Sequence, residues 1–274
     1  MLERELDEAA RIARRAGELV LGLYHADYDV EMKGKNDPVT EADKLANDHI
    51  VAALRAAFPD DGVVAEESLD RSDATARRRC WFVDPLDGTK EFIAKNGEFA
   101  VMLGLAIDGE SQLGVVYQPV FDKLYRGVVG QGATLERAGT TTPLSPSDVA
   151  SPADLKLVVS RSHRARTIDE VVRRLGIAHE TRSGSVGLKI GIIAERTADL
   201  YVHYSDRSSL WDTCGPEAVL RAAGGRFSDL TGAPYRYDRS DMRTVGGILA
   251  CNAAAYEAVL PVAHAVAREA GFLG

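Results

Sequence analysis

One segment, Asp84–Thr89 with the sequence DPLDGT, constrains the fold of this chain more than any other. It follows the apolar run Cys80–Val83, which is too short for a helix and is typical of a strand. Because proline fixes its own φ and cannot continue a sheet ladder, we expect the strand to end there and the chain to turn. The turn brings the carboxylates of Asp84 and Asp87 to one side, where the Leu86 carbonyl adds a third oxygen.

Oxygen donors of this kind suit Mg²⁺. The alternative is an ordinary Asp-Pro turn whose acids cap a helix. That alternative weakens because acids also follow two other apolar runs: Glu66 and Glu67 come after a run that ends at Ala65, and Asp212 comes after Trp211. If these ends converge, the crowded carboxylates would repel one another and their pKa values would rise unless cations lay between them. Two cations about 4 Å apart are a known arrangement for phosphoryl hydrolysis.

Asp43 has two interpretations. With Thr40 as N-cap of a helix, Asp43 occupies position N3 and would complete a capping box. Alternatively, Asp43 pairs with Thr89 to orient and deprotonate an attacking water. The sequence leaves both open.

The remaining patterns predict two halves, residues 1–145 and 146–274. Apolar residues at helical spacing between Leu2 and Leu23 predict a first helix, and a second begins near Thr40 and ends at Pro59. From Phe99 to about Leu135, short strands separated by turns indicate an antiparallel meander.

After a stretch rich in Thr, Ser, Pro and Gly at residues 137–153, strands alternate with helices, which is typical of an α/β half. The strands expected there are 155–159, 200–202 and 248–250, and the helices are 168–175, 188–194, 217–223 and 253–267.

Composition narrows the class of partner. The chain has 274 residues, a formal net charge of −8 and no long basic run, which argues against a nucleic-acid polymer as partner. No segment approaches the roughly 20 apolar residues of a membrane span, and the N-terminus lacks a signal-peptide pattern. The three cysteines are widely separated, as expected for reduced thiols in a cytoplasmic protein.

Taken together, four segments resemble the lithium-sensitive, magnesium-dependent phosphatase superfamily of inositol monophosphatase. They match its signatures in order and spacing over essentially the whole chain, and they are Pro38–Asp43, Glu66–Ser68, Asp84–Thr89 and Trp211–Asp212. The resemblance implies an α+β and α/β fold, a layered αβαβα sandwich of the inositol monophosphatase type. The first half would carry most metal ligands, and the second would carry substrate-binding residues and Asp212.

The resemblance also implies roles for particular residues. The metal ligands would be Glu66, Asp84, the Leu86 carbonyl, Asp87 and Asp212, which would hold two or three Mg²⁺ ions. Asp43 and Thr89 would be the catalytic pair that activates water. Gly88 and Thr89 would also present backbone amides to the phosphate.

Within the superfamily, the details resemble the 3'(2'),5'-bisphosphate nucleotidase branch. Lys90–Ile93 follows Asp84–Thr89, the segment predicted to bind metal, which we call the metal turn. Ser160–His163 reads SRSH, and Trp211–Glu217 matches the branch except that Gly215 stands where it has Ala. Val186 and Gly187 also depart from the Ser-Ser pair of some members. The implied substrate contacts are Glu66, Leu86, Asp87, Gly88, Thr89, Lys90, Ser160, Ser162, His163, Gly184, Ser185, Lys189 and Asp212.

The predicted activity is hydrolysis of the 3'-phosphate of adenosine 3',5'-bisphosphate, and of 3'-phosphoadenylyl sulfate, by direct attack of a metal-activated water. The family implies inhibition by lithium, a place in sulfate assimilation and a homodimer in some members. One alternative is an inositol monophosphatase or a broad sugar phosphatase. Others are a non-catalytic sensor of phosphorylated ligands, and a metabolite-binding α/β protein whose acids are surface turns.

Overall fold

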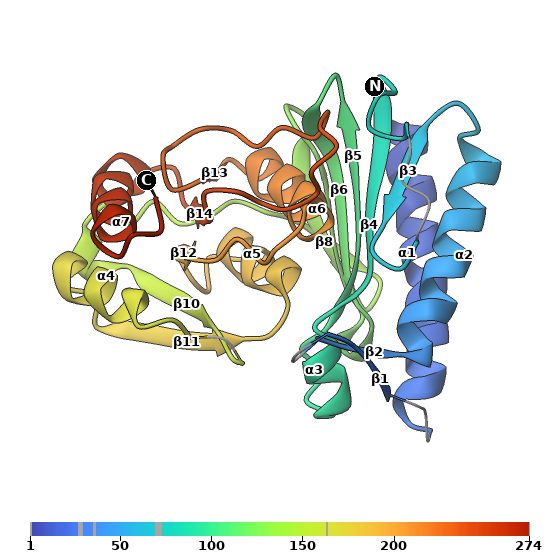
Figure 1. Ribbon diagram of the computed structural model, residues 1–274, viewed down its shortest axis with the longest axis horizontal. Helices are drawn as coiled ribbons and strands as arrows, with labels where there is room; N and C mark the ends of the chain where they lie inside the picture. The colour runs from blue at the N-terminus through green and yellow to red at the C-terminus, as the bar shows by residue number, and fades with distance from the viewer. Residues whose placement is uncertain (1, 27–29, 35–36, 69–72, 163, 274) are drawn as a thin grey trace.

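The computed structural model describes residues 2–26, 30–34, 37–68, 73–162 and 164–273. Five layers alternate between helices and sheets (Figure 1). The outer helices on one side are α1 (Glu3–Tyr24) and α2 (Glu41–Ala57), those between the sheets are α5 (Val186–Ala194) and α6 (Leu210–Ala222), and those on the far side are α4 (Thr167–Leu175) and α7 (Tyr256–Glu269). The predicted αβαβα sandwich is therefore confirmed. A hairpin of β1 (Val30–Gly34) and β2 (Asp37–Thr40) precedes α2.

The seven-stranded sheet runs in the order β3-β4-β5-β6-β7-β8-β9, with β3 parallel to β4 and every later pair antiparallel. Its strands are β3 (Gly62–Ala65), β4 (Arg79–Asp87), β5 (Ala100–Ile107), β6 (Glu110–Gln118), β7 (Lys123–Val128), β8 (Gly132–Arg137) and β9 (Thr140–Pro143). The meander is as the sequence predicts. The strands β8 and β9 extend it, and β9 lies inside the segment that we expected to link the two halves. The division at residue 145 stays a prediction.

The second sheet has the order β11-β10-β12-β14-β13, in which β11, β10 and β12 are parallel. Its strands are β10 (Lys156–Ser160), β11 (His179–Ser183), β12 (Leu200–His203), β13 (Arg226–Ser228) and β14 (Ile248–Cys251). The three apolar strands were predicted. The edge strand β11 was not, because four of its five residues are exposed and polar.

The expectation that a strand ends at Val83 is wrong. Strand β4 continues through Pro85 to Asp87, and its register against β5 shifts between Asp84 and Asp87. Proline is tolerated in a strand at such an irregularity, where no ladder hydrogen bond is needed from its nitrogen. The backbone turns later, at Gly88, whose φ is 101°, and enters the short helix α3 (Thr89–Ile93).

The expected helix 217–223 is also corrected, because α6 begins seven residues earlier, at Leu210. Asp212 therefore lies in the first turn of a helix and does not follow a strand. A proline inside a helix is normally unfavourable, and Pro216 lies inside this one. Because of Pro216, the sequence pattern did not indicate that the helix begins at Leu210.

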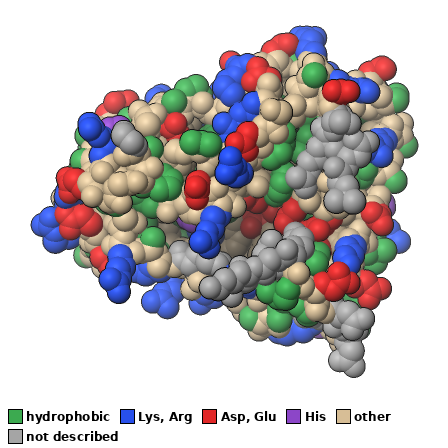
Figure 2. Space-filling view, viewed as in Figure 1, with side chains coloured by type: hydrophobic (Ala, Val, Ile, Leu, Met, Phe, Trp, Pro, Cys, Tyr) green, Lys and Arg blue, Asp and Glu red, His purple; other side chains and the backbone are tan. Residues whose placement is uncertain are grey.

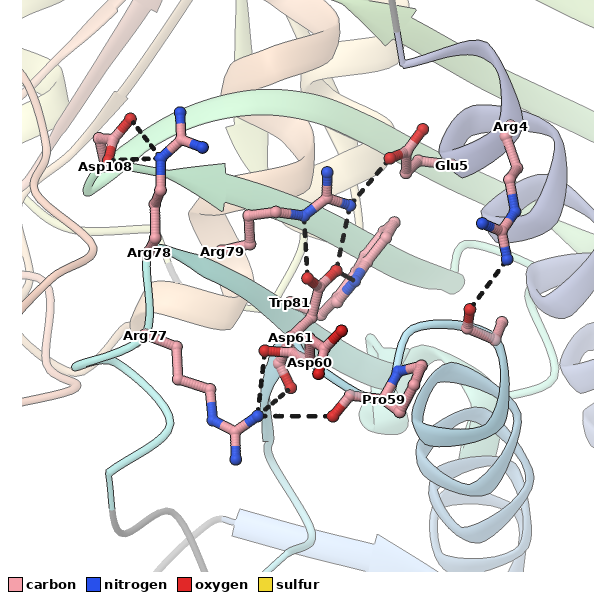
Figure 3. A network of polar contacts seen from close by, with 11 residues as sticks. Arg4, Glu5, Pro59, Asp60, Asp61, Arg77, Arg78, Arg79, Trp81 and Asp108 are labelled. Carbon is pink, nitrogen blue, oxygen red and sulfur yellow. Dashed lines mark hydrogen bonds and ion pairs between the residues drawn. The ribbon is translucent and has the colours of Figure 1, made fainter.

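The start of β4 is anchored by Asp61, which follows α2 (Figure 3). The Asp61 carboxylate accepts hydrogen bonds from Arg79 at 2.9 and 3.1 Å and from Trp81 Nε1 at 2.9 Å. Arg79 also pairs with Glu5 of α1 at 2.9 Å. These contacts fix α1 and the end of α2 to the strand whose other end carries the two aspartates of the metal turn.

Helix α6 lies unusually close to the seven-stranded sheet. A Cβ atom on Gly114 of β6 would lie 2.0 Å from the Gly215 carbonyl oxygen, and one on Gly215 would lie 2.7 Å from the Leu103 carbonyl oxygen. Only glycine allows backbones to approach this closely. The departure from the branch pattern at Gly215 is thus explained by packing, which also fixes the position of Asp212. Within the described ranges, no helix is long and apolar enough to cross a bilayer.

We expect Gly114→Ala to destabilise the fold by about 1–3 kcal/mol, because its methyl group would push α6 from the sheet. Urea unfolding would measure the loss. Gly22→Ala is the matched control, since a Cβ there meets nothing within 4 Å. That change in a helix is expected to stabilise the protein by up to about 1 kcal/mol. Equal stability of Gly114→Ala and the wild type would contradict the close packing.

Candidate active site

Four carboxylates from three separate segments meet at one place, and we call them the acidic cluster: Glu66, Asp84, Asp87 and Asp212. Glu66 follows β3, and Asp212 lies in the first turn of α6. Asp84 and Asp87 lie at the end of β4. Asp84 is only 2% exposed. Acidic side chains gather beside a hollow near the middle of the face shown in Figure 2. The acids that follow separate apolar segments therefore converge, as the sequence predicts.

Burial and mutual repulsion disfavour the charged forms of the carboxylates in the acidic cluster. Burial, and then the charges of Glu66, Asp87 and Asp212, raise the pKa of Asp84 well above its ordinary value. Burial is also the largest cause that raises the pKa of Asp212, to about 8, and its carboxyl shares a hydrogen bond with Asp84. Mutual repulsion therefore favours a proton on at least one of these carboxylates at neutral pH, unless a cation lies among them.

The metal turn is closed by its own side chains. Asp84 Oδ1 accepts a hydrogen bond from the Leu86 amide at 3.0 Å, across the register shift in β4. The Thr89 hydroxyl lies 3.0 Å from Asp43 Oδ1 and 3.3 Å from the Leu86 carbonyl oxygen. Asp84 and Thr89 thus hold the backbone of Leu86 from both sides, at its amide and at its carbonyl.

Both interpretations of Asp43 have structural support, because its two oxygens have different partners. Oδ2 accepts from the Thr40 amide at 2.7 Å and from the Thr40 hydroxyl at 2.6 Å, which is the predicted capping box. Oδ1 faces Thr89. Burial is the largest of the causes that act on the Asp43 carboxyl, and it raises its pKa. The water-activating role stays a prediction.

Asp212 repeats this arrangement on α6. Ser209 is the N-cap, and its amide donates to Asp212 Oδ2 at 2.6 Å. Two helices therefore present an aspartate at position N3, with one oxygen held by the N-cap amide. In each case the helix start fixes the carboxylate before any ligand arrives.

Asp87 faces the start of α5. Its Oδ2 accepts from the Ser185 hydroxyl at 2.5 Å and from the Gly187 amide at 3.0 Å. Lys189, one turn into the helix, is 3% exposed, and its ammonium donates to the carbonyls of Ser185 at 2.6 Å and Gly184 at 3.3 Å. Burial lowers the pKa of Lys189, and the charges of Asp87 and nearby acids oppose this. The Lys189 amino group therefore lies among the acids of the site and is held by two backbone carbonyls.

The other predicted substrate residues lie around this centre. Ser160 ends β10, and the Ser162 hydroxyl donates to Glu91 at 2.5 Å. Gly88 and Lys90 flank the start of α3 and are half-buried. His163 lies outside the described residues. That these residues contact substrate stays a prediction.

Sequence reasoning missed Glu91 and Glu98 as site residues. Glu91 is buried although charged, and Glu98 binds Arg161 and the Gly184 amide. Neither forms a pattern with its sequence neighbours, so only their contacts across the fold reveal them.

The donors near the cluster fit a hard divalent cation. They are carboxylate oxygens and one carbonyl, the ligands that Mg²⁺ prefers, and no thiolate lies among the predicted ligands. In the part of the chain that the structure describes, no three or more His, Cys, Asp or Glu side chains form a preformed metal cage. Asp87 and Asp212 instead direct oxygens to hydrogen-bond donors. The buried, mutually repelling carboxylates are the observation that supports a cation here.

Comparison with known proteins identifies the family. The model of the Inositol monophosphatase family matches residues 1–268. Among curated proteins, the 3'(2'),5'-bisphosphate nucleotidase CysQ of Escherichia coli (strain K12) is 38% identical over 235 residues, which cover 85% of this chain and 93% of that protein. The chain therefore belongs to the inositol monophosphatase family.

Solved structures give the same result. Inositol monophosphatase from Anabaena (Nostoc) sp. PCC 7120 superposes with a TM-score of 0.79 at 27% identity and covers 95% of both chains. CysQ from Bacteroides thetaiotaomicron has a TM-score of 0.77 at 29% identity, over 92% of this chain and 98% of that one. The predictions of the family, of the fold and of an enzyme that cleaves phosphoric monoesters are confirmed.

If the acidic cluster binds Mg²⁺, the ion will stabilise the folded protein. At 100 times its dissociation constant, a ligand adds about 2.7 kcal/mol to the free energy of unfolding. We expect the melting temperature to rise with Mg²⁺ in the wild type and much less in Asp84→Asn, measured by calorimetry. Asp148→Asn is the control, because that side chain is 93% exposed and is not part of the cluster. An equal Mg²⁺ shift in Asp84→Asn would contradict the site.

Proposed function

We propose that this chain is a Mg²⁺-dependent phosphatase that removes the 3'-phosphate of adenosine 3',5'-bisphosphate and of 3'-phosphoadenylyl sulfate. The observation that carries the proposal is the acidic cluster, with its raised pKa values, beside the hydrogen-bonded pair Asp43–Thr89. The similarity to CysQ nucleotidases favours a nucleotide substrate.

The predicted metal ligands are the acidic cluster and the Leu86 carbonyl. Bound Mg²⁺ would neutralise the phosphate and lower the pKa of water. The protein contributes the fixed positions of the donors, because backbone amides of β4, of α5 and of the N-cap of α6 hold Asp84, Asp87 and Asp212 respectively. Preorganised donors of this kind need little rearrangement during the reaction.

Asp43 and Thr89 would accept the proton of the attacking water. The Thr89 hydroxyl can accept from water while it donates to Asp43 Oδ1. Because Oδ2 is held by Thr40, the remaining oxygen keeps a fixed direction. The raised pKa of Asp43 makes it a stronger base than an exposed aspartate.

The second half of the pocket would bind the remainder of the nucleotide. Ser185 and Lys189 lie against Asp87 at the start of α5, so a phosphate at the metal turn would have these groups beside it. We propose that Ser160, Ser162, His163 and Gly184 complete this subsite. Lithium inhibition, a cytoplasmic location, a role in sulfate assimilation and a homodimer follow from the same proposal.

Substrate preference tests the proposal. Phosphate release would be measured with Mg²⁺ from adenosine 3',5'-bisphosphate and from inositol 1-phosphate at equal concentrations. We expect the nucleotide to be hydrolysed with the higher kcat/KM, because the second phosphate has a subsite. Preference for inositol 1-phosphate would keep the phosphatase chemistry and replace the substrate. No release from either would refute the function.

The water-activating pair is tested by Thr89→Ala, with Thr89→Ser as the matched control. Loss of the hydroxyl is expected to lower kcat by about 10²–10⁴-fold, the usual contribution of a general base, with little change in KM. Thr89→Ser keeps the hydroxyl and should retain most of the activity. If Thr89→Ala is as active as Thr89→Ser, the hydroxyl takes no part in the proton transfer.

A further inference from the structure

Glu98 joins two parts of the chain that are distant in sequence. It follows α3 and precedes β5, and its carboxylate binds the Arg161 guanidinium with two hydrogen bonds of 2.6 and 2.5 Å. The same carboxylate accepts the Gly184 amide at 2.7 Å. A short distance away, Glu91 accepts the Ser162 hydroxyl. The segment after the metal turn is thus tied to the ends of β10 and β11.

The turn that Glu98 holds is strained and crowded. Ser185 has a φ of 51°, in the left-handed region that side-chain-bearing residues rarely adopt. A Cβ on Gly184 would lie 2.4 Å from the Glu91 side chain and 2.5 Å from the Glu98 carbonyl oxygen. Such a conformation persists only where its surroundings fix it. Glu98 fixes the Gly184 amide, and Lys189 fixes the carbonyls of Gly184 and Ser185.

The Gly184–Ser185 turn places two hydrogen-bond donors next to Asp87. The Ser185 hydroxyl and the Gly187 amide both reach Asp87 Oδ2, and the hydroxyl is directed there by the Ser185 backbone. Glu98 is therefore linked through this turn to a predicted metal ligand that it does not contact. Side chains that orient a ligand in this way alter metal affinity by about 10–100-fold when they are removed.

We propose that Glu98 is a positioning residue, which through the Gly184–Ser185 turn holds the Asp87 carboxylate in the orientation that divalent-metal binding requires. This inference rests on the proposed function, because it assumes that Asp87 binds the metal. Arg161 takes part by neutralising Glu98 and fixing its rotamer, since the bidentate pair leaves the carboxylate one orientation.

The experiment compares Glu98→Ala with Glu98→Gln. Alanine removes the acceptor of the Gly184 amide, whereas the glutamine carbonyl oxygen can still accept that hydrogen bond. The two readouts are the Mg²⁺ concentration that gives half-maximal phosphate release from adenosine 3',5'-bisphosphate, and the affinity for Mg²⁺ alone by calorimetry. We expect Glu98→Ala to raise the half-saturating Mg²⁺ and the Mg²⁺ dissociation constant about tenfold. Glu98→Gln keeps an acceptor for the amide but loses one of the two bonds to Arg161, so both values should rise clearly less than in Glu98→Ala.

Glu180→Ala is the matched control. Glu180 also pairs with one arginine, Arg164, but it lies in the exposed part of β11 and precedes the Gly184–Ser185 turn. The control should leave both Mg²⁺ readouts unchanged. If Glu98→Ala does not fold, Arg161→Met replaces it, because that change leaves the Glu98 acceptor in place and frees its rotamer. It should raise both Mg²⁺ values about threefold or more.

The outcomes separate this inference from the proposed function. If the wild type releases phosphate with Mg²⁺ but Glu98→Ala, or Arg161→Met in its place, has wild-type values in both readouts, the positioning role is overturned and the phosphatase stands. An equal rise in Glu98→Ala and Glu98→Gln would also overturn it, because the amide acceptor would then not matter. If the wild type binds no Mg²⁺ and releases no phosphate, the proposed function itself fails.

Discussion

The burial of several carboxylates at one point is the constraint on which the site depends. Asp84 lies almost wholly inside the protein, with Glu66, Asp87 and Asp212 close enough to raise its pKa. Charged groups are costly to bury unless they are paired or hydrogen-bonded. The structure offsets that cost with backbone amides at Asp84, Asp87 and Asp212, with the buried ammonium of Lys189, and with a hydrogen bond between two of the acids. These compensations are incomplete, which is why a divalent cation suits the site.

The layered fold brings these groups together from distant parts of the chain. The end of β4 supplies two acids, α6 supplies Asp212, and the start of α5 supplies the donors to Asp87. Helix α6 can occupy its place only because glycines on the sheet and on the helix let the two backbones touch. The position of Asp212, a predicted metal ligand, therefore rests on the absence of side chains at glycines elsewhere in the fold.

Two helix starts in this protein combine a capping box with an aspartate that has a predicted functional role. At Thr40–Asp43 and at Ser209–Asp212, the N3 carboxylate accepts the N-cap amide with one oxygen, and the same carboxylate faces the predicted site residues Thr89 and Asp84 respectively. A capping box and a functional role are commonly treated as alternatives. Here the cap holds one oxygen of an aspartate whose functional role is predicted, so the two interpretations are compatible.

The sequence by itself determined the features that local patterns encode. The oxygen-rich motif at Asp84–Thr89, the capping box at Asp43, the amphipathic outer helices and the apolar strands are all visible in it, because each depends on neighbouring residues. Only the tertiary structure decided that β4 passes through Pro85, that α6 begins at Leu210, and that polar β11 is a strand. It alone pairs Asp87 with Ser185 and Glu98 with Arg161. Those outcomes depend on which distant backbone lies alongside, and no periodicity in the chain records that.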